Sequence, residues 1–217
     1  SISDIPRNTF KPIVNRLIYL ALSHNQLSKM NPNKFRDMLN ELVKLRMLYL
    51  IDNGFTQLPN LNSLKTLEEI ELSENELESI RDAKTGEILL PAKVIDLQLR
   101  NNRFKHLTKQ TFAGLHNLKY LNLEANQIRY IDSDAFSLLP RLKNIYLSNN
   151  YIKHIPSKAI YHLIDLQRFD LSSQNQMLRE IDSYAFDRVS NEVSIKIDLS
   201  KNRIQKLGPK MFCSRNK

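Results

Sequence analysis

Apolar and polar positions along the chain recur with a long, regular period. The segments that start at Leu118 and Leu142 align without a gap over 24 residues, in the frame L-x-x-L-x-L-x-x-N-x-I-x-x-I-x-x-x-x-F/I-x-x-L. Within it, the x-L-x-L-x stretch alternates with a period of two, which is typical of a short strand with one face in a core. A helix would need apolar residues at steps of three and four throughout. The pattern therefore predicts one strand in each repeat.

Six further copies of the frame flank these two segments. The seventh copy is irregular, since Leu166, Phe169 and Leu171 fit but two extra residues precede Ile181. An amide side chain both donates and accepts hydrogen bonds, so we expect the recurrent asparagines to bridge backbone groups of neighbouring turns, a structural role. They are Asn25, Asn53, Asn75, Asn102, Asn126, Asn150 and Asn202.

The chain resembles the leucine-rich-repeat superfamily over essentially its whole length, because the frame recurs eight times. Several copies carry a phenylalanine five residues after an apolar position, as in Ile131 with Phe136 and Ile181 with Phe186. These copies resemble the 24-residue "typical" class, which occurs largely in extracellular proteins such as Toll-like receptors, chaoptin- and Slit-like proteins and small proteoglycans. The copy at residues 45–64 has the shorter length common in cytoplasmic scaffolds.

The resemblance implies an α/β repeat solenoid, a horseshoe with a parallel β-sheet on its concave side and an irregular or short-helical convex side. No turn buries its own apolar side alone, so stacking supplies the core. We expect a single solenoid domain over residues 1–217, with about eight full repeats and partial repeats at residues 1–16 and after residue 212. A solenoid cut in mid-repeat exposes its core edge, so we expect a longer array or other segments as caps.

Two insertions break the period, at residues 81–93 and 173–181. Insertions in solenoids lie on loops and in some proteins bind partners. Added loop length costs little free energy, so neutral drift is the commoner explanation.

The concave face of such a horseshoe is made by the x positions of the strands. Met47, Tyr49 and Ile51 place an apolar cluster where strand exteriors are normally polar, and tyrosine and methionine are enriched at protein interfaces. The alternative is that a cap or a neighbouring domain covers Tyr19 and Met47. The predicted partner-binding residues are Tyr19, Met47, Tyr49, Ile51, Glu69, Glu71, Glu74, Arg100, Tyr120, Asn122, Tyr146 and Arg168.

The formal net charge is +9, but the strand positions of the concave face sum to about −4, which leaves the convex side and loops strongly basic. A nucleic-acid-binding protein places its lysines and arginines on the face that binds, so nucleic acid is an improbable ligand. The basic convex side is a possible contact for an anionic glycan.

Signals for catalysis are poor. The four glycines are isolated, so no phosphate-binding loop is present, and the five histidines have no zinc-type motif. Cys213 is the only cysteine and lacks an identifiable base. We therefore expect no catalytic, cofactor-binding or metal-binding residues and no enzyme activity. No apolar stretch reaches the length of a transmembrane segment.

The compartment is left open by opposing features. The N-terminal residues lack the apolar region of a signal peptide, and the single cysteine and missing Asn-x-Ser/Thr sites favour an intracellular protein. The repeat class favours an extracellular one. Our first hypothesis is a secreted or cell-surface module of receptor, adhesion or innate-immune type that binds a protein partner. The alternatives are an intracellular scaffold or enzyme regulator, and an enzyme whose catalytic domain lies outside this segment. The sequence indicates no particular oligomeric state.

Overall fold

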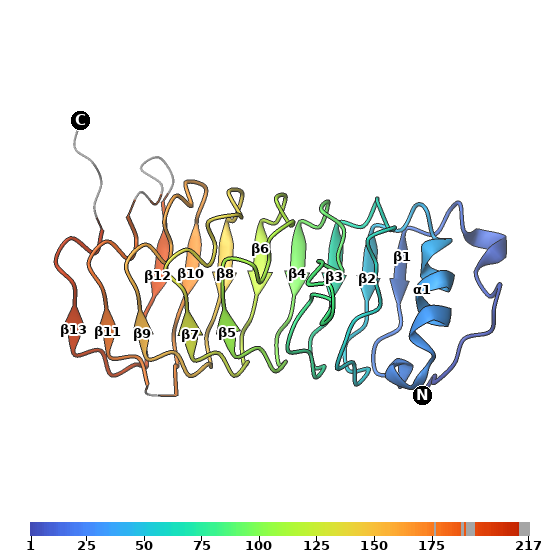
Figure 1. Cartoon of the computed structure of the whole chain (residues 1–217), viewed down its shortest axis with the longest axis horizontal. Coiled ribbons are helices and arrows are strands. Elements are labelled where there is room, and N and C mark those ends of the chain that lie inside the picture. The colour runs from blue at the N-terminus through green and yellow to red at the C-terminus, as the bar shows by residue number, and fades with distance from the viewer. Residues whose placement is uncertain (176, 188, 190–193, 213–217) are drawn as a thin grey trace.

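The computed structural model describes residues 1–175, 177–187, 189 and 194–212. They form a row of stacked coils, and each coil adds one strand to a continuous parallel sheet (Figure 1). The sheet has eight strands in the order in which they occur along the chain. They are β1 (Tyr19–Ala21), β2 (Met47–Tyr49), β3 (Glu69–Glu71), β4 (Asp96–Gln98), β6 (Tyr120–Asn122), β8 (Asn144–Tyr146), β10 (Arg168–Asp170) and β12 (Lys196–Asp198). The predicted strand-per-repeat solenoid is confirmed.

The first seven strands of this sheet bury their middle residue and turn the two flanking residues outward, and the middle residue of β12, Ile197, is partly buried. Leu48, Ile70, Leu97 and Leu121 are fully buried and lie opposite one another in register. This is the outcome expected of the x-L-x-L-x alternation, because successive side chains of a strand point to opposite faces. The spacing of the leucines therefore fixes both the register of the sheet and the identity of its outward side chains.

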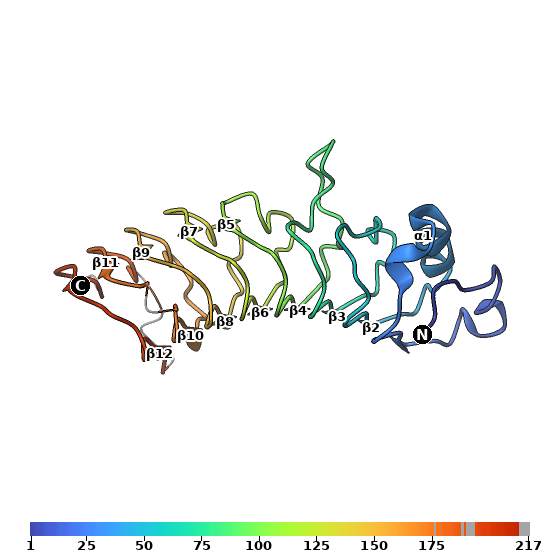
Figure 2. The ribbon, with the colours of Figure 1, turned by 90° about the horizontal axis from the view of Figure 1, so that it is seen from below.

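The opposite, convex side carries short elements that the repeat pattern did not predict (Figure 2). Its two-residue strands pair in parallel as β5–β7 and β9–β11–β13. They are β5 (His106–Leu107), β7 (Tyr130–Ile131), β9 (His154–Ile155), β11 (Glu180–Ile181) and β13 (Lys206–Leu207). Two 3-10 turns, η1 (Lys11–Ile13) and η2 (Leu27–Lys29), and one helix, α1 (Pro32–Asn40), lie near the N-terminal end. The convex side is thus partly irregular and short-helical, as expected, and in the later repeats it also contains short strands.

Helix α1 replaces the extended convex segment of its repeat because its sequence favours a helix start. The Asn31 side chain caps the helix by accepting hydrogen bonds from the backbone N–H groups of Asn33 and Lys34, and Pro32 occupies the first helical position. Phe35 and Leu39, four residues apart, are buried against the coils. Phe35 stacks on Phe55 of the next repeat, with ring centroids 5.9 Å apart.

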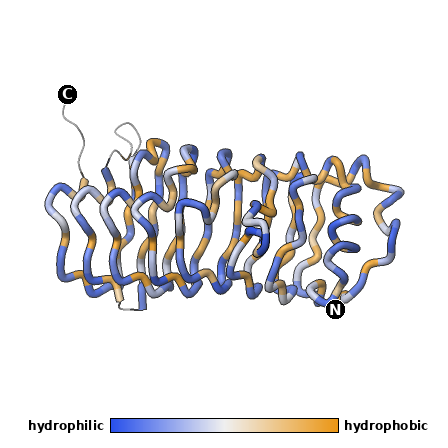
Figure 3. Tube along the Cα trace, viewed as in Figure 1, coloured by the Kyte–Doolittle hydropathy of each residue, from blue (hydrophilic) through white to orange (hydrophobic). Residues whose placement is uncertain are grey.

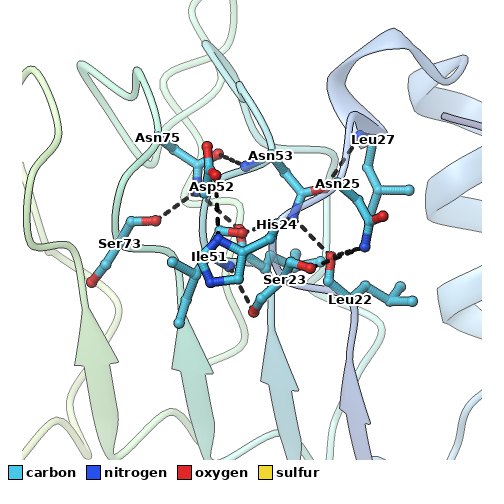
Figure 4. Close-up of polar contacts among 11 residues, drawn as sticks. Leu22, Ser23, His24, Asn25, Leu27, Ile51, Asp52, Asn53, Ser73 and Asn75 are labelled. Carbon is cyan, nitrogen blue, oxygen red and sulfur yellow. Dashed lines mark hydrogen bonds and ion pairs between the residues drawn. The ribbon is translucent and has the colours of Figure 1, made fainter. Parts of the chain in front are cut away.

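The asparagines form a ladder along one edge of the large sheet, as predicted, and those from Asn53 to Asn150 are buried. In Figure 4, Asn53 Nδ2 donates to the backbone oxygens of Leu22 (2.9 Å) and Ile51 (3.1 Å), and its Oδ1 accepts from the Leu27 N–H at 3.2 Å. Asn75 makes the equivalent contacts one repeat later. Each amide therefore joins two coils through their backbones, which confirms the structural role.

The irregular seventh repeat fills its ladder position with Gln174, which the asparagine pattern did not include. Gln174 is fully buried, its Oε1 accepts from the Ile152 N–H at 3.1 Å, and its Nε2 donates to the Leu147 oxygen at 2.7 Å. Its distance from Leu171 along the chain equals that of Asn150 from Leu147, so the spacing alone could have identified it. The longer amide side chain makes the same two bridges as asparagine.

The residue before each ladder amide adopts the left-handed conformation, although none is glycine. The φ angles lie between +49° at Asp52 and +59° at Glu74. This conformation strains L-residues, but the N–H of each such residue up to the seventh repeat donates to a carbonyl of the next coil, as Ala125 does to Ser148 at 3.0 Å. The inter-coil hydrogen bonds thus hold the turns that end the first seven strands of the large sheet.

Apolar side chains from every coil meet in one continuous core, and the hydropathy pattern repeats from coil to coil (Figure 3). The phenylalanines of the frame lie on its convex side. Phe112 stacks on Phe104, and Phe186 packs edge-on against Phe169. Among the described residues, no buried side-chain nitrogen or oxygen lacks a hydrogen-bond partner. Close stacking of the coils therefore buries the apolar side chains and gives the buried polar side chains of the described residues their hydrogen-bond partners.

The first insertion, residues 81–93, contains a small ordered hairpin that projects from the solenoid (Figure 2). Arg81 and Ile88 pair as an antiparallel bridge, and Asp82 Oδ1 accepts from the Lys84 and Thr85 N–H groups at the tip. Arg81 Nη2 donates to the Ala113 oxygen at 2.5 Å, which ties the hairpin base to the next repeat. The second insertion, residues 173–181, includes residue 176, which lies outside the described residues. Cys213 lies outside them as well.

Candidate binding face

The concave face consists of two columns of outward side chains that run the length of the sheet. The strand register places Tyr19, Met47 and Glu69 side by side in the first column, and Ala21, Tyr49 and Glu71 in the second. Neighbouring strands lie about 4.8 Å apart, so each column presents one side chain at about that interval. A partner lying along the solenoid axis would meet every repeat in turn.

The structure places the predicted partner-binding residues on this face or at its margin. Ile51 and Arg100 follow the ends of their strands, and Glu74 is the exposed left-handed residue before Asn75. The others lie in the two columns: Tyr19, Met47, Glu69, Tyr120 and Arg168 in the first, and Tyr49, Glu71, Asn122 and Tyr146 in the second.

An aromatic cluster lies at the N-terminal end of the face. The rings of Tyr19 and Tyr49 pack edge to face with centroids 5.2 Å apart, and Tyr19 stays 48% exposed. The Tyr49 hydroxyl donates to Glu69 Oε1 on the neighbouring strand. That hydrogen bond, together with burial, raises the pKa of Tyr49 to about 12. The ring is therefore held in place by its neighbour and remains neutral at physiological pH.

An acidic segment adjoins the aromatic cluster. Glu69, Glu71 and Asp96 lie on adjacent strands, and within the described part of the chain no lysine or arginine forms an ion pair with them. Asp96 is half-buried, and burial raises its pKa, an effect that the hydrogen bond from Gln98 Nε2 (2.6 Å) opposes. Uncompensated carboxylates on a partly buried face give it a negative potential.

The C-terminal half of the face has a mixed character. The Arg168 guanidinium lies 5.3 Å from the centroid of the Tyr146 ring, a cation–π contact. Asn144 Nδ2 donates to the Tyr146 hydroxyl at 3.2 Å, so this ring too is positioned. Tyr120, between the two halves, is 37% exposed. Aromatic side chains therefore recur along the face, separated by acidic and amide groups.

On the convex side, two histidines bond to aspartates of a following repeat. His106 Nε2 lies 2.6 Å from Asp132 Oδ1, and His154 Nε2 lies 2.9 Å from Asp182 Oδ1. The hydrogen bond from His154 lowers the pKa of Asp182. These exposed pairs link neighbouring coils.

A cluster with the composition of a metal site is absent from the described residues, which contain no group of three or more histidine, cysteine, aspartate or glutamate side chains able to hold an ion. None of the described helices is long and apolar enough to span a bilayer.

Comparison with known proteins finds a leucine-rich-repeat match in the middle of the chain. The model of the leucine rich repeat family matches residues 93–152. A solved leucine-rich-repeat protein of Leptospira interrogans is similar over 90% of this chain and 52% of its own, with 24% identity and a TM-score of 0.67. A comparison with curated proteins finds no match.

Two further similar chains come from solved complexes. One belongs to the octameric complex of Latrophilin 3, Unc5D and FLRT2, with 23% identity, a TM-score of 0.61, and coverage of 78% of this chain and 57% of that one. The other belongs to the Drosophila Toll–Spatzle complex, with 22% identity, a TM-score of 0.67, and coverage of 81% and 26%. The chain thus spans from about a quarter to just over half of these proteins. The likeness shows a shared fold.

Proposed function

We propose that this chain is a leucine-rich-repeat module for protein recognition, part of a secreted or cell-surface protein of receptor, adhesion or innate-immune type. The observation that carries the proposal is the concave face itself. Positioned aromatic rings are exposed there on a rigid sheet, beside carboxylates that no cation of the described chain neutralises. Rigid aromatic anchors of this kind are typical hot spots of protein interfaces.

The face also suggests the chemistry of the partner. Tyr49 and Tyr120 lie on β2 and β6, three strand steps apart, which corresponds to about 14 Å at the usual strand spacing. The acidic segment of Glu69, Glu71 and Asp96 lies between them. We therefore propose a partner whose apolar contacts flank a basic surface, so that its lysines or arginines meet these carboxylates.

Similar proteins occur in assemblies of Toll with Spatzle, and of FLRT2 with Latrophilin 3 and Unc5D. Those partners are properties of those proteins, and they support a role in protein binding here only by analogy of fold. The extracellular setting rests on the same analogy and on the repeat class. Expressing the full-length natural protein with its own termini tests it: recovery from the medium supports this setting, and cytosolic retention favours an intracellular scaffold instead.

Site-directed photo-crosslinking tests the face. A photoreactive phenylalanine analogue replaces Tyr120 on the concave face or, as a matched control, Tyr130 on the convex side, which is 62% exposed. We expect a covalent partner adduct from position 120 only. Against the partner so identified, Tyr49→Ala with Tyr120→Ala should weaken binding by roughly 1,000-fold while the fold persists, given about 2 kcal/mol for each hot-spot residue.

Two results would overturn the proposal. One is adduct formation from position 130 alone, which would place the interface on the convex side. The other is unchanged affinity of the double tyrosine variant with a native circular dichroism spectrum. Raising the ionic strength should also weaken the complex if the acidic segment meets a basic surface, because exposed charges are screened within about 8 Å at physiological salt.

A further inference from the structure

A groove lies at the edge of the large sheet where its strands begin. It has a volume of about 230 Å³ and is lined by Glu68, Lys93, Ile95, Asn117, Lys119 and Arg141. These residues precede β3, β4, β6 and β8, so four successive coils contribute to one hollow. We call it the basic edge groove. None of its residues belongs to the two columns of the concave face.

The groove carries uncompensated positive charge. Its only carboxylate, Glu68, is neutralised by Arg46, whose Nη2 lies 2.5 Å from Glu68 Oε2. No acidic side chain of the described residues pairs with Lys93, Lys119 or Arg141, unlike Lys105, whose Nζ lies 2.6 Å from Glu78 Oε1. Three cations held close together without an anion repel one another. A negatively charged ligand would relieve this repulsion between the three cations.

The guanidinium of Arg141 is held in position by the protein itself. Its Nη1 donates to Asn117 Oδ1 at 2.8 Å, and Asn117 Nδ2 donates in turn to the Ala92 oxygen at 2.9 Å. This chain of bonds runs from Arg141 to the backbone of the coil that carries Lys93. A guanidinium has five N–H donors in a fixed plane, so a guanidinium fixed in advance loses less entropy on binding an oxyanion.

The arrangement favours an elongated ligand. Lys93, Lys119 and Arg141 come from three successive coils, so the charges span about 10 Å along the solenoid axis at the usual strand spacing. Lys65 precedes β3 in the coil before that of Lys93, and Lys143 lies two residues after Arg141 in the same coil. Single-stranded nucleic acid is usually bound by aromatic side chains that stack on its bases, and none lines this groove.

We propose that the basic edge groove binds the sulfate groups of a linear sulfated glycan whose chain runs along the solenoid axis. The proposal rests on the extracellular setting proposed above, where such glycans occur. It places an anionic glycan at the sheet edge, where the hollow lies, rather than on the convex side expected from the charge distribution. The glycan site and the concave face are separate surfaces, so both can be occupied at once.

Heparin, a soluble sulfated glycan, serves as the probe. The triple variant Lys93→Gln, Lys119→Gln, Arg141→Gln removes three charges from the groove. The matched control, Arg129→Gln, Lys153→Gln, Arg179→Gln, removes three exposed cations from successive coils that precede β7, β9 and β11. Affinity for a heparin oligosaccharide is measured by calorimetry at about 0.15 M salt, and thermal unfolding confirms that all proteins are folded.

We expect the wild type to bind, the groove variant to lose roughly 30-fold or more in affinity, and the control to lose less than about threefold, because only the groove variant removes charge-assisted contacts. Equal losses in both variants, or no binding by the folded wild type, would overturn the proposal. Duplex DNA of similar charge competing as well as heparin would overturn the glycan assignment. The concave-face proposal is tested independently of the glycan proposal, because the variant with Tyr49→Ala and Tyr120→Ala should keep the heparin affinity of the wild type.

Discussion

Replacing Asn126 by alanine is expected to lower the free energy of unfolding by about 2–4 kcal/mol. The contacts of this side chain show which of its hydrogen bonds account for the loss. Asn126 is 3% exposed. Its Nδ2 donates to the oxygens of Leu99, Leu123 and Glu124, and its Oδ1 accepts from the Phe104 N–H at 3.0 Å.

The three carbonyls contribute little to the loss because each keeps another partner. The Leu99 oxygen still accepts from Asn102 Nδ2, the Leu123 oxygen from Asn150 Nδ2, and the Glu124 oxygen from the Asn101 N–H. The Phe104 N–H has no such substitute. An orphaned buried donor costs about 1–3 kcal/mol, and the small void left by truncation adds about 1 kcal/mol.

The matched control is Asn25→Ala at the N-terminal end of the same ladder. Asn25 is only half-buried, and its Oδ1 accepts from the Ile2 N–H at 2.5 Å, where water can replace it. We expect a loss below about 1 kcal/mol, because an exposed donor that regains water loses little.

Urea unfolding followed by circular dichroism measures both variants, and hydrogen exchange tests the mechanism. The Phe104 amide should lose protection in Asn126→Ala, while the Ile128 amide, held by Asn150, should keep it. Equal destabilisation by the two substitutions, or normal protection at Phe104, would refute the reasoning.

Three smaller effects follow from the same structure. In Glu69→Gln, the pKa of Tyr49 should fall from about 12 towards 10, since the carboxylate is the main cause of the shift. Ultraviolet titration measures this pKa, with Tyr49→Phe as the reference that lacks the hydroxyl, and an unchanged pKa contradicts the prediction. In the wild type this raised pKa contributes stability that is complete below about pH 10 and is lost as the pH rises to about 12. The lowered pKa of Asp182 contributes stability that is present above about pH 4 and is lost as the pH falls through the folded-state pKa. Asp182→Asn should therefore flatten the acid limb of the stability curve, with a loss below about 1 kcal/mol at neutral pH because the pair with His154 is exposed to solvent; an unaltered acid limb would count against this. Ala125 has a φ of +53°, so Ala125→Val should destabilise by about 1–2 kcal/mol while Ala125→Gly stays within about 1 kcal/mol of the wild type; thermal unfolding in the reverse order would contradict the assignment of strain.

Much of the candidate binding face could be predicted from spacing alone. In a strand, a residue two positions from a buried leucine shares the leucine's face, and a residue directly adjacent to the leucine points to the opposite face. The alternation by itself therefore predicts that Tyr49 and Tyr120 point outward, and the ladder role of Asn75 follows from spacing in the same way. Gln174 was not predicted, because the repeat frame specified asparagine rather than any amide at that position.

The basic edge groove is the opposite case. Lys93, Asn117 and Arg141 come from segments between strands, where no alternation dictates direction, and their meeting depends on the stacking of coils of unequal length. Likewise, the sequence shows the charge of Arg46 and of Lys119 but not that the first is neutralised by Glu68 and the second is unpaired. Periodicity is a local property of the backbone and therefore determines the sheet and its two faces. Ion pairing depends on which long side chains of separate coils come within reach, so only the tertiary structure decides where the uncompensated charge gathers.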